Sequence, residues 1–293
     1  MEHKPVLLNE VIKLLRPDQG RVFIDATIDG GGHAREILKR MGEKAILIGI
    51  DRDKKMISRL QKEFAGEARL KLKAGNFRNI GELAGEFAKK CDGILFDLGL
   101  SSIQLESSGR GFSFQKDEPL LMTYESDSGP NTLNAAKIVN SLPENELAEI
   151  LRNYGEEKFA GRIARAIVAA RRRERILTTG QLTDIVKTAA GRFYKHQKIH
   201  PATRTFQALR LAVNDELGAL ATGLDQAWDM LVHGGRLTVL SFHSLEDRIV
   251  KKFFLEKKPQ VGILTKKAVR PSVAEIKDNP RARSARLRSA EKI

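Results

Sequence analysis

Short apolar runs alternate with amphipathic segments through the first hundred residues of the chain. The runs predict strands at 22–24, 45–50, 70–73 and 93–97, and the segments predict helices at 4–15, 34–40, 53–65 and 80–89. Asn9 is the expected cap of the first helix. Strands that alternate with helices form a mostly parallel α/β sheet with right-handed crossovers. Ligands of such a sheet bind at the carboxyl ends of its strands.

The alternating pattern stops after residue 104. Residues 105–130 are rich in Ser, Gly and Pro and predict a long loop, which in a compact domain is usually functional. Helical patterns follow at 132–140, 144–152, 156–173, 179–191, 203–222 and 223–232, before a fifth strand at 236–240 and a tail that could add an antiparallel hairpin. We therefore expect a sheet domain, 1–108 and 215–293, with an inserted all-helical domain, 109–214, for substrate recognition.

A glycine turn, Gly30-Gly31-Gly32, separates the first strand from the next helix. Glycine lets a ligand approach the main chain, and a helix N-terminus presents unpaired N–H groups to it. Asp25 and Asp51 end the first two strands, and a carboxylate about 20 residues beyond such a turn can accept both hydroxyls of a ribose. The pattern predicts a nucleoside site; its alternative is a tight turn without a ligand. The spacing differs from G-x-G-x-x-G, which counts against a dinucleotide dehydrogenase.

The chain is strongly basic. Its 293 residues include 51 Lys and Arg against 37 Asp and Glu, which gives a formal net charge of +14. This excess favours a polyanionic partner, RNA or DNA, over a protein that is merely basic. The positive charges gather at 156–175, at 195–210 and in the tail at 266–288. Arginines at the end of a helix also suit its dipole, so the first cluster is equally compatible with a structural role.

Several chemistries are not expected from this sequence. The single cysteine, Cys91, excludes an internal disulfide framework and provides no metal cluster. The chain has no signal-peptide pattern and no run of about 18 apolar residues. We therefore expect a cytoplasmic protein with no bound metal and no contact with a membrane.

Longer motifs match one protein family over essentially the full length of the chain. The motifs are Asp25-Ala-Thr with Gly31-Gly-His33, Gly49-Ile-Asp51, Asp97-Leu-Gly-Leu-Ser-Ser-Ile-Gln104, Gly109-Arg-Gly-Phe-Ser-Phe114, Tyr154-Gly-Glu-Glu, His200-Pro-Ala-Thr-Arg-Thr-Phe-Gln-Ala-Leu-Arg210 and Ser241-Phe-His-Ser-Leu-Glu-Asp-Arg-Ile-Val-Lys251. By these motifs the chain resembles the bacterial 16S rRNA cytosine-N4 methyltransferases, the RsmH (MraW) family.

The resemblance implies a class I S-adenosylmethionine-dependent methyltransferase with a Rossmann-like sheet, and therefore S-adenosyl-L-methionine as cofactor. The implied activity is that of a 16S rRNA (cytosine(1402)-N(4))-methyltransferase, which acts at the decoding site on naked rRNA or on the small ribosomal subunit. Carried over position by position, the implied cofactor contacts are Gly31, Gly32, His33, Asp51, Phe77, Asp97 and Gln104. The protein would act as a monomer or a homodimer.

Two positions depart from the family pattern. Asp29 stands where the family has glycine, and its carboxylate could crowd the methionine end of the cofactor. Residues 121–125, Leu-Met-Thr-Tyr-Glu, stand where the family has Asp-Met-Arg-Met-Asp. Thr123 therefore replaces an arginine near the expected substrate loop, which affects the expected target or efficiency.

The cytosine N4 amine is a poor nucleophile because its lone pair is delocalised into the ring. An acceptor for one N4 hydrogen would help to localise that pair. Asp97, or a main-chain carbonyl of 98–101, is the candidate acceptor because it follows the fourth strand, but no catalytic base is assigned. His243 is a second candidate, and its alternative is a helix-capping histidine in a capping box, Ser241 to Ser244 or Ser244 with Asp247. Ser241 could also cap the helix that follows the fifth strand.

Other residues have less specific interpretations. His33 is expected to order the glycine loop rather than to carry a proton. Phe112, Phe114 and Tyr124 could stack on an extruded target base or pack the insertion onto the sheet. Two further functions stay open: a methyltransferase for another nucleic-acid or protein amine, and a non-catalytic rRNA-binding factor. Cofactor binding and the identity of the methylated nucleoside would separate them.

Overall fold

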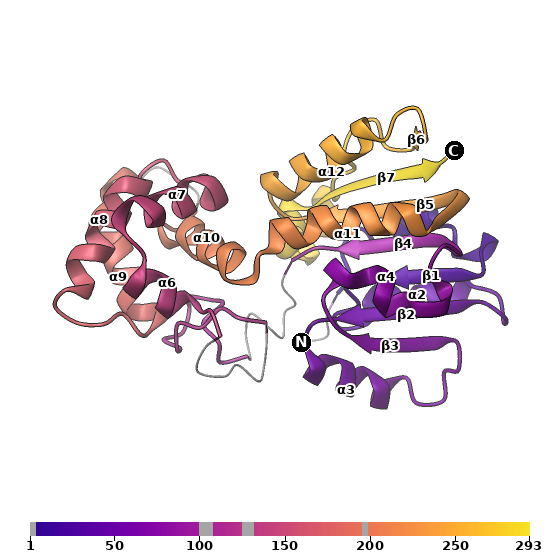
Figure 1. Cartoon of the computed structure of the whole chain (residues 1–293), viewed down its shortest axis with the longest axis horizontal. Coiled ribbons are helices and arrows are strands. Elements are labelled where there is room, and N and C mark those ends of the chain that lie inside the picture. The colour runs from indigo at the N-terminus through magenta and orange to yellow at the C-terminus, as the bar shows by residue number, and fades with distance from the viewer. Residues whose placement is uncertain (1–3, 100–107, 125–131, 195–198) are drawn as a thin grey trace. The chain divides into compact units, whose positions relative to one another are not determined.

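The computed structural model describes residues 4–99, 108–124, 132–194 and 199–293 (Figure 1). The chain forms two compact units, which we call the sheet unit (Met1–Gly99 with Leu217–Ile293) and the helical unit (Leu100–Glu216). The predicted insertion, 109–214, lies within the helical unit. The division on the N-terminal side falls directly after the fourth strand.

The sheet unit is built on a seven-stranded sheet of order β3-β2-β1-β4-β5-β7-β6. Its strands are β1 (Val22–Asp25), β2 (Ile46–Asp51), β3 (Leu70–Ala74), β4 (Cys91–Asp97), β5 (Leu231–Ser241), β6 (Val261–Ile263) and β7 (Arg286–Lys292). Strands β1 to β5 are parallel, and β7 runs antiparallel to β5 and β6, which confirms the predicted sheet and tail hairpin. The order brings the carboxyl ends of β2, β1 and β4 side by side.

Amphipathic helices complete the sheet unit (Figure 1). They are α1 (Leu8–Leu15), α2 (Gly32–Arg40), α3 (Lys54–Glu63), α4 (Ile80–Ala84), α11 (Glu216–Met230), α12 (Ser244–Glu256) and α13 (Val273–Asp278). Helix α3 shows why they form: Asp53 caps it by accepting the N–H of Lys55 at 2.9 Å, and Met56, Ile57 and Leu60 are buried along one side. Burying each such side chain contributes about 1.5–3 kcal/mol.

The helical unit has its own apolar core. Its helices are α6 (Ala135–Ser141), α7 (Glu144–Gly155), α8 (Ala160–Arg171), α9 (Thr179–Ala190) and α10 (Ala202–Asn214). Thr178 and Gln181 form a reciprocal capping box at the start of α9. Gly155 allows α7 and α10 to approach closely, because a Cβ atom there would lie 2.6 Å from the carbonyl oxygen of Arg204. The described part of this insertion is therefore helical, as predicted.

Several helix boundaries differ from the prediction; the helix expected at 80–89, for example, ends at Ala84. One helix was expected at 203–222 and another at 223–232, but the break falls at Asp215, whose φ of +44° ends α10. No Gly or Pro marks that break in the sequence. Asn9 does not cap α1; the chain enters that helix through Leu7, whose N–H donates to Glu275 Oε1 at 2.7 Å. A cap supplied from the far end of the chain cannot be inferred from local sequence.

Candidate active site at the carboxyl ends of the strands

The glycine turn between β1 and α2 leaves an open helix N-terminus. Gly31 has a φ of +74°, and a Cβ atom there would lie 3.0 Å from the Phe64 ring, so both the conformation and the space favour glycine. A Cβ atom on Gly32 would meet Pro5 at 3.1 Å. No side chain caps α2. The first turn of α2 can therefore direct main-chain N–H groups at an anionic or polar ligand.

Asp51 fixes the end of β2 to this turn. Its Oδ1 accepts the N–H of Asp53 at 2.8 Å, and its Oδ2 accepts the N–H of Asp29 at 3.1 Å. Burial nevertheless raises the pKa of Asp51 to about 7. Asp29 takes a left-handed conformation, with φ +44°, as a glycine at this position readily could. Although Asp29 departs from the family pattern, the turn is preserved, and the main-chain N–H of Asp29 binds the Asp51 carboxylate.

His33 joins the tips of β1 and β4. Its Nδ1 lies 3.2 Å from Asp97 Oδ2, and its Nε2 lies 3.1 Å from the carbonyl oxygen of Val6. A carbonyl oxygen only accepts, and so does an ionised carboxylate, so this geometry favours a proton on both ring nitrogens. Burial opposes the charged ring, but the hydrogen bond and charge of Asp97, together with Asp25, raise the pKa of His33. Asp97 and Asp25 thus favour the protonated form of the buried His33 ring.

Asp25 and Thr27 complete this arrangement. Asp25 is almost fully buried, and that burial raises its pKa to about 7; the neighbouring His33 charge acts in the opposite direction. Thr27 Oγ1 accepts the N–H of Asp97 at 2.6 Å. The sequence analysis included Thr27 in the Asp25-Ala-Thr motif but assigned it no role. The result is a preorganised acidic edge centred on Asp97.

Phe77 follows β3 in a short 3₁₀ helix, η2 (Phe77–Asn79). Its ring meets Phe96 edge-on at a centroid distance of 5.4 Å, and Gly223 makes room for it. The N–H of Gly75 donates to the carbonyl oxygen of Asp51, which holds this segment beside the tip of β2. Phe77 therefore lies beside Asp51 in the row of strand tips. The remaining predicted contact, Gln104, lies outside the described residues.

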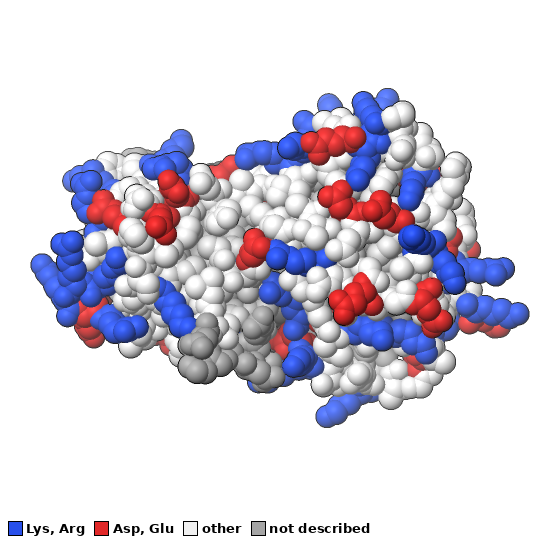
Figure 2. All heavy atoms as spheres, viewed as in Figure 1, with Lys and Arg blue, Asp and Glu red and all other residues white. Residues whose placement is uncertain are grey.

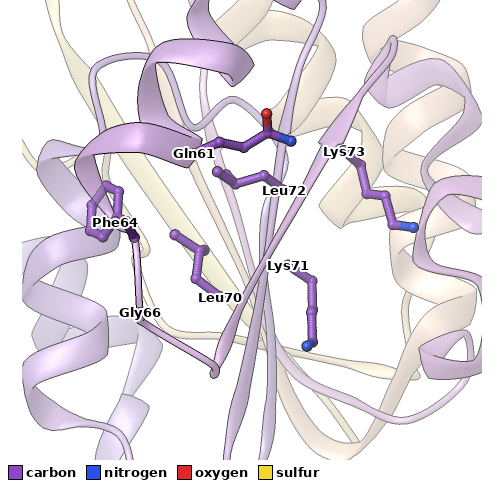
Figure 3. A pocket seen from close by; sticks show the side chains of 8 residues that line it. Gln61, Phe64, Gly66, Leu70, Lys71, Leu72 and Lys73 are labelled. Carbon is purple, nitrogen blue, oxygen red and sulfur yellow. The ribbon is translucent and has the colours of Figure 1, made fainter.

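A different hollow lies along the edge strand β3 (Figure 3). This pocket has a volume of about 320 Å³ and is lined by Gln61, Phe64, Ala65, Gly66, Leu70, Lys71, Leu72 and Lys73. None of the predicted cofactor contacts lines it. It belongs to the outer side of β3 and α3 and not to the row of strand tips.

His243 caps α12. Its Nδ1 accepts the N–H of Glu246 at 3.4 Å, and Glu246 in turn accepts the N–H groups of Phe242 and His243. The capping interpretation is confirmed, but the cap is His243 itself and not Ser241, whose Oγ donates to the carbonyl oxygen of Arg286. The predicted serine cap was therefore wrong. Only 11% of the His243 side chain is exposed, so the residue is a structural one.

The aromatic residues of the long loop belong to the helical unit. Phe112 and Tyr124 stack at 5.4 Å and are both buried in its core. Phe114 stacks on His200 at 4.5 Å and meets Phe206 edge-on. Phe112 and Tyr124 therefore pack within the helical unit, and Phe114 packs against the same core while staying partly exposed. Stacking of these rings on a target base stays a prediction.

Many of the basic residues in the predicted clusters have acidic or carbonyl partners. Arg210 pairs with Glu216 at 2.9 Å, and Arg286 and Arg288 both bind Asp247, at 3.0 and 2.6 Å. Arg171 donates to the carbonyl oxygen of Val139, and Arg165 pairs with Glu144. Residues 195–198 of the second cluster lie outside the described residues. Part of the positive charge in these clusters therefore has a structural role.

The described residues offer little other chemistry. They contain no group of three or more His, Cys, Asp and Glu side chains that could hold a metal ion. No described helix is long and apolar enough to cross a membrane. Burial raises the pKa of Cys91 to about 12, which keeps this thiol protonated and unreactive.

The chain was then compared with known proteins. The MraW methylase family matches it over residues 1–293. Ribosomal RNA small subunit methyltransferase H of Heliobacterium modesticaldum is 44% identical over 311 residues, with 99% of this chain and 98% of the relative covered. The protein of that name from Deinococcus radiodurans is 49% identical over 296 residues, with coverages of 99% and 89%.

The solved structures that resemble this chain are less similar to it than its sequence relatives are. An rRNA methylase from Streptococcus thermophilus has a TM-score of 0.45 and 9% identity, with coverages of 98% and 93%. That similarity is too low to add to the family assignment, which rests on the full-length sequence matches. The predicted fold class agrees with the observed sheet, parallel from β1 to β5 with a helical insertion between β4 and β5. The chain therefore belongs to the MraW methylase family, as its motifs predicted.

Proposed function

We propose that this protein transfers a methyl group from S-adenosyl-L-methionine to the N4 amine of a cytidine in 16S rRNA, cytidine 1402 at the decoding site. The observation that carries the proposal is the full-length match to the MraW methylase family and to rRNA small subunit methyltransferases. The row of buried acidic groups beside an uncapped helix N-terminus supports it. The high net charge of +14 suits an rRNA substrate.

The residues at the strand tips fit the cofactor. Asp51 is a buried acceptor whose ionised form is disfavoured by burial, and hydroxyl donors such as those of a ribose would stabilise that form. The open N-terminus of α2 at Gly31 and Gly32 suits the carboxylate of the methionine moiety. His33 would contribute through its main chain, because both ring nitrogens face protein groups. Phe77, Asp97 and Gln104 complete the proposed contacts.

When bound, S-adenosyl-L-methionine supplies an electrophilic methyl group on a sulfonium. The protein then has to align the nucleophile and localise its lone pair. Asp97 is the proposed acceptor for an N4 hydrogen, since its side chain is 15% exposed at the end of β4. His33 and Thr27 hold Asp97 from its side chain and its main chain. Asp97 is thereby oriented before the substrate arrives.

The helical unit is the proposed substrate-recognition domain. It is inserted between β4 and β5, and it begins three residues after Asp97, the proposed acceptor at the end of β4. The unit has an apolar core of its own, so it can present a binding surface to the substrate without packing support from the sheet. The proposed partner is 16S rRNA, alone or within the small ribosomal subunit.

The test is methyl transfer from labelled S-adenosyl-L-methionine to small ribosomal subunits that lack this modification. We expect N4-methylated cytidine at position 1402, identified by nucleoside mass spectrometry and primer extension. Asp97→Asn should reduce turnover by about 10²-fold or more, as for loss of an oriented acceptor, while the exposed control Asp225→Asn should not. Cofactor binding without transfer by the wild-type protein would refute the proposed function. Unchanged turnover and cofactor affinity in Asp97→Asn would refute the role of Asp97.

A further inference from the structure

The described part of the helical unit carries an exposed aromatic ring flanked by arginines. Phe193 lies in the 3₁₀ segment η4 (Gly191–Tyr194), and 39% of it is exposed. The guanidinium carbon of Arg162, on α8, lies 4.8 Å from the centroid of the Phe193 ring, and that of Arg192 lies 4.7 Å from it. We call these three residues the Arg–Phe–Arg cluster.

The two arginines have no acidic partner among the described residues. Both are exposed, and their distances to one ring place the two charges within about 10 Å of each other. That separation is about one Debye length at 0.1 M salt, so their mutual repulsion is not fully screened. Arg165, one turn further along α8, differs because it pairs with Glu144 at 3.3 Å. The cluster therefore concentrates positive charge that no described acidic side chain neutralises.

A buried carboxylate holds the cluster in place. Glu157 is 1% exposed and accepts both the N–H of Phe159, at 2.8 Å, and the hydroxyl of Tyr194. It thereby ties the start of α8 to η4. Phe159 also stacks on Phe193, with a centroid distance of 4.7 Å and an interplanar angle of 24°. The exposed ring is thus anchored on a rigid support.

The chemistry of the cluster fits the backbone of a nucleic acid. A guanidinium that lies over an aromatic ring is held by a cation–π contact of about 0.5–1 kcal/mol at an exposed site. Its planar N–H donors remain available for the paired oxygens of a phosphate, which arginine recognises in a bidentate manner. Ordering the side chains beforehand lowers the entropy cost of binding. Figure 2 shows Lys and Arg side chains gathered at the end of the helical unit that carries α8.

We propose that the Arg–Phe–Arg cluster is a phosphate clamp for the rRNA backbone, in which Arg162 and Arg192 bind phosphates and Phe193 positions them. This inference rests on the proposed rRNA substrate and adds a contact surface to it. Phosphate contacts fix the register and orientation of a nucleic acid without reading its bases. The clamp therefore contributes to affinity and positioning, and not to the choice of the methylated base.

The test measures binding to unmethylated small ribosomal subunits over a series of salt concentrations. Each phosphate contact contributes about 0.7 to the slope of log K against log[salt] for a single strand and about 0.9 for a duplex. The double variant Arg162→Gln/Arg192→Gln should therefore lower the slope by about 1.5 and weaken binding about 10-fold or more near 0.1 M salt. The matched control Arg165→Gln removes one charge from the same helix and should change the slope much less.

Phe193→Leu tests the aromatic support separately. It keeps both charges and an apolar contact with Phe159 but removes the cation–π geometry. We expect it to weaken binding by a few-fold, less than the double variant, while cofactor affinity and the melting temperature stay as in the wild type. Wild-type salt dependence in the double variant, with correct folding shown by cofactor binding, would overturn the clamp.

The outcome is distinguishable from failure of the proposed function. If the wild-type protein does not methylate the subunits at all, the proposed substrate is wrong. If it methylates them and the double variant binds with the same slope and affinity, only the clamp is wrong. Methylation of the same nucleoside by the double variant at saturating subunit concentration is the expected result, because the clamp does not read the base.

Discussion

Replacing Asp51 with Asn should remove two opposite effects of rising pH on the wild-type protein, namely a loss of stability and a gain in cofactor affinity. Asp51 is 9% exposed at the end of β2, and burial raises its pKa from 3.8 to about 7. The folded protein therefore holds this proton more tightly than the unfolded chain does. The stability that depends on it is fully present below about pH 4 and is lost as the pH rises through about 7. An asparagine keeps the shape of the protonated side chain and removes the titration.

The magnitude follows from the two pKa values. A difference of about three pH units corresponds to about 4 kcal/mol in the limit of complete ionisation. Between pH 5 and pH 7 the wild-type protein should lose about 2 kcal/mol through Asp51 alone. The pKa of Asp25 is also raised to about 7, so Asp25 adds a similar loss of stability. Because both proteins contain Asp25, this loss cancels when they are compared. The difference in pH dependence between wild type and Asp51→Asn therefore isolates Asp51.

Urea unfolding of the cofactor-free proteins at pH 5, 6, 7 and 8 measures this difference. Asp225→Asn, at an exposed acidic position, is the control for loss of one carboxylate. Calorimetric binding of S-adenosyl-L-methionine supplies the second readout. Ribose hydroxyls that donate to ionised Asp51 should make the wild-type affinity rise between pH 6 and 8, whereas Asp51→Asn should bind weakly at every pH. Equal loss of stability in the two proteins between pH 5 and 7 would refute the reasoning about burial.

Two further predictions concern packing. Gly31→Ala should lower the free energy of unfolding by about 1–2 kcal/mol because of its left-handed φ, and by more because of the contact with Phe64. Urea unfolding should therefore show a larger loss than in Gly66→Ala, where φ is +91° but the space around a Cβ atom is open. Equal losses in the two variants would rule out the contact. Glu216→Ala removes the carboxylate that pairs with Arg210, of which only 14% is exposed, and should lower the free energy of unfolding by about 3–5 kcal/mol. Glu144→Ala breaks the exposed pair with Arg165 and should cost under about 1 kcal/mol, and similar values for both would contradict the difference in burial.

The sheet and the row of strand tips could be predicted from the sequence because their signals are local. Residues 22–24 and 93–96 are continuous apolar runs, as expected for central parallel strands buried on both sides. Once the strands are parallel, their carboxyl ends share one edge of the sheet. The positions of Asp51 and Asp97 then follow without any knowledge of side-chain contacts.

The contacts that organise those tips could not be predicted in the same way. His33 binds the carbonyl oxygen of Val6 and the carboxylate of Asp97, and neither partner is near it in the sequence. The cap at His243 had a usable signal, because Glu246 follows at the spacing of a capping box. Both Ser241 and His243 were possible caps by sequence, and the local pattern did not decide between them. Local rules locate an element, whereas its partners depend on the tertiary fold.

The basic residues show why composition alone could not define a nucleic-acid surface. Helix α8 contains arginines of the same chemical type in three different situations: Arg171 donates to a main-chain carbonyl, Arg165 pairs with a carboxylate and Arg162 lies over an exposed ring. The structural and the phosphate-binding interpretations of this helix therefore apply to different residues within it. A paired arginine must give up its partner before it binds phosphate, while Arg162 and Arg192 do not. The net charge of the chain thus favours a polyanionic partner, and the lack of an acidic partner among the described residues distinguishes Arg162 and Arg192 as the proposed phosphate contacts.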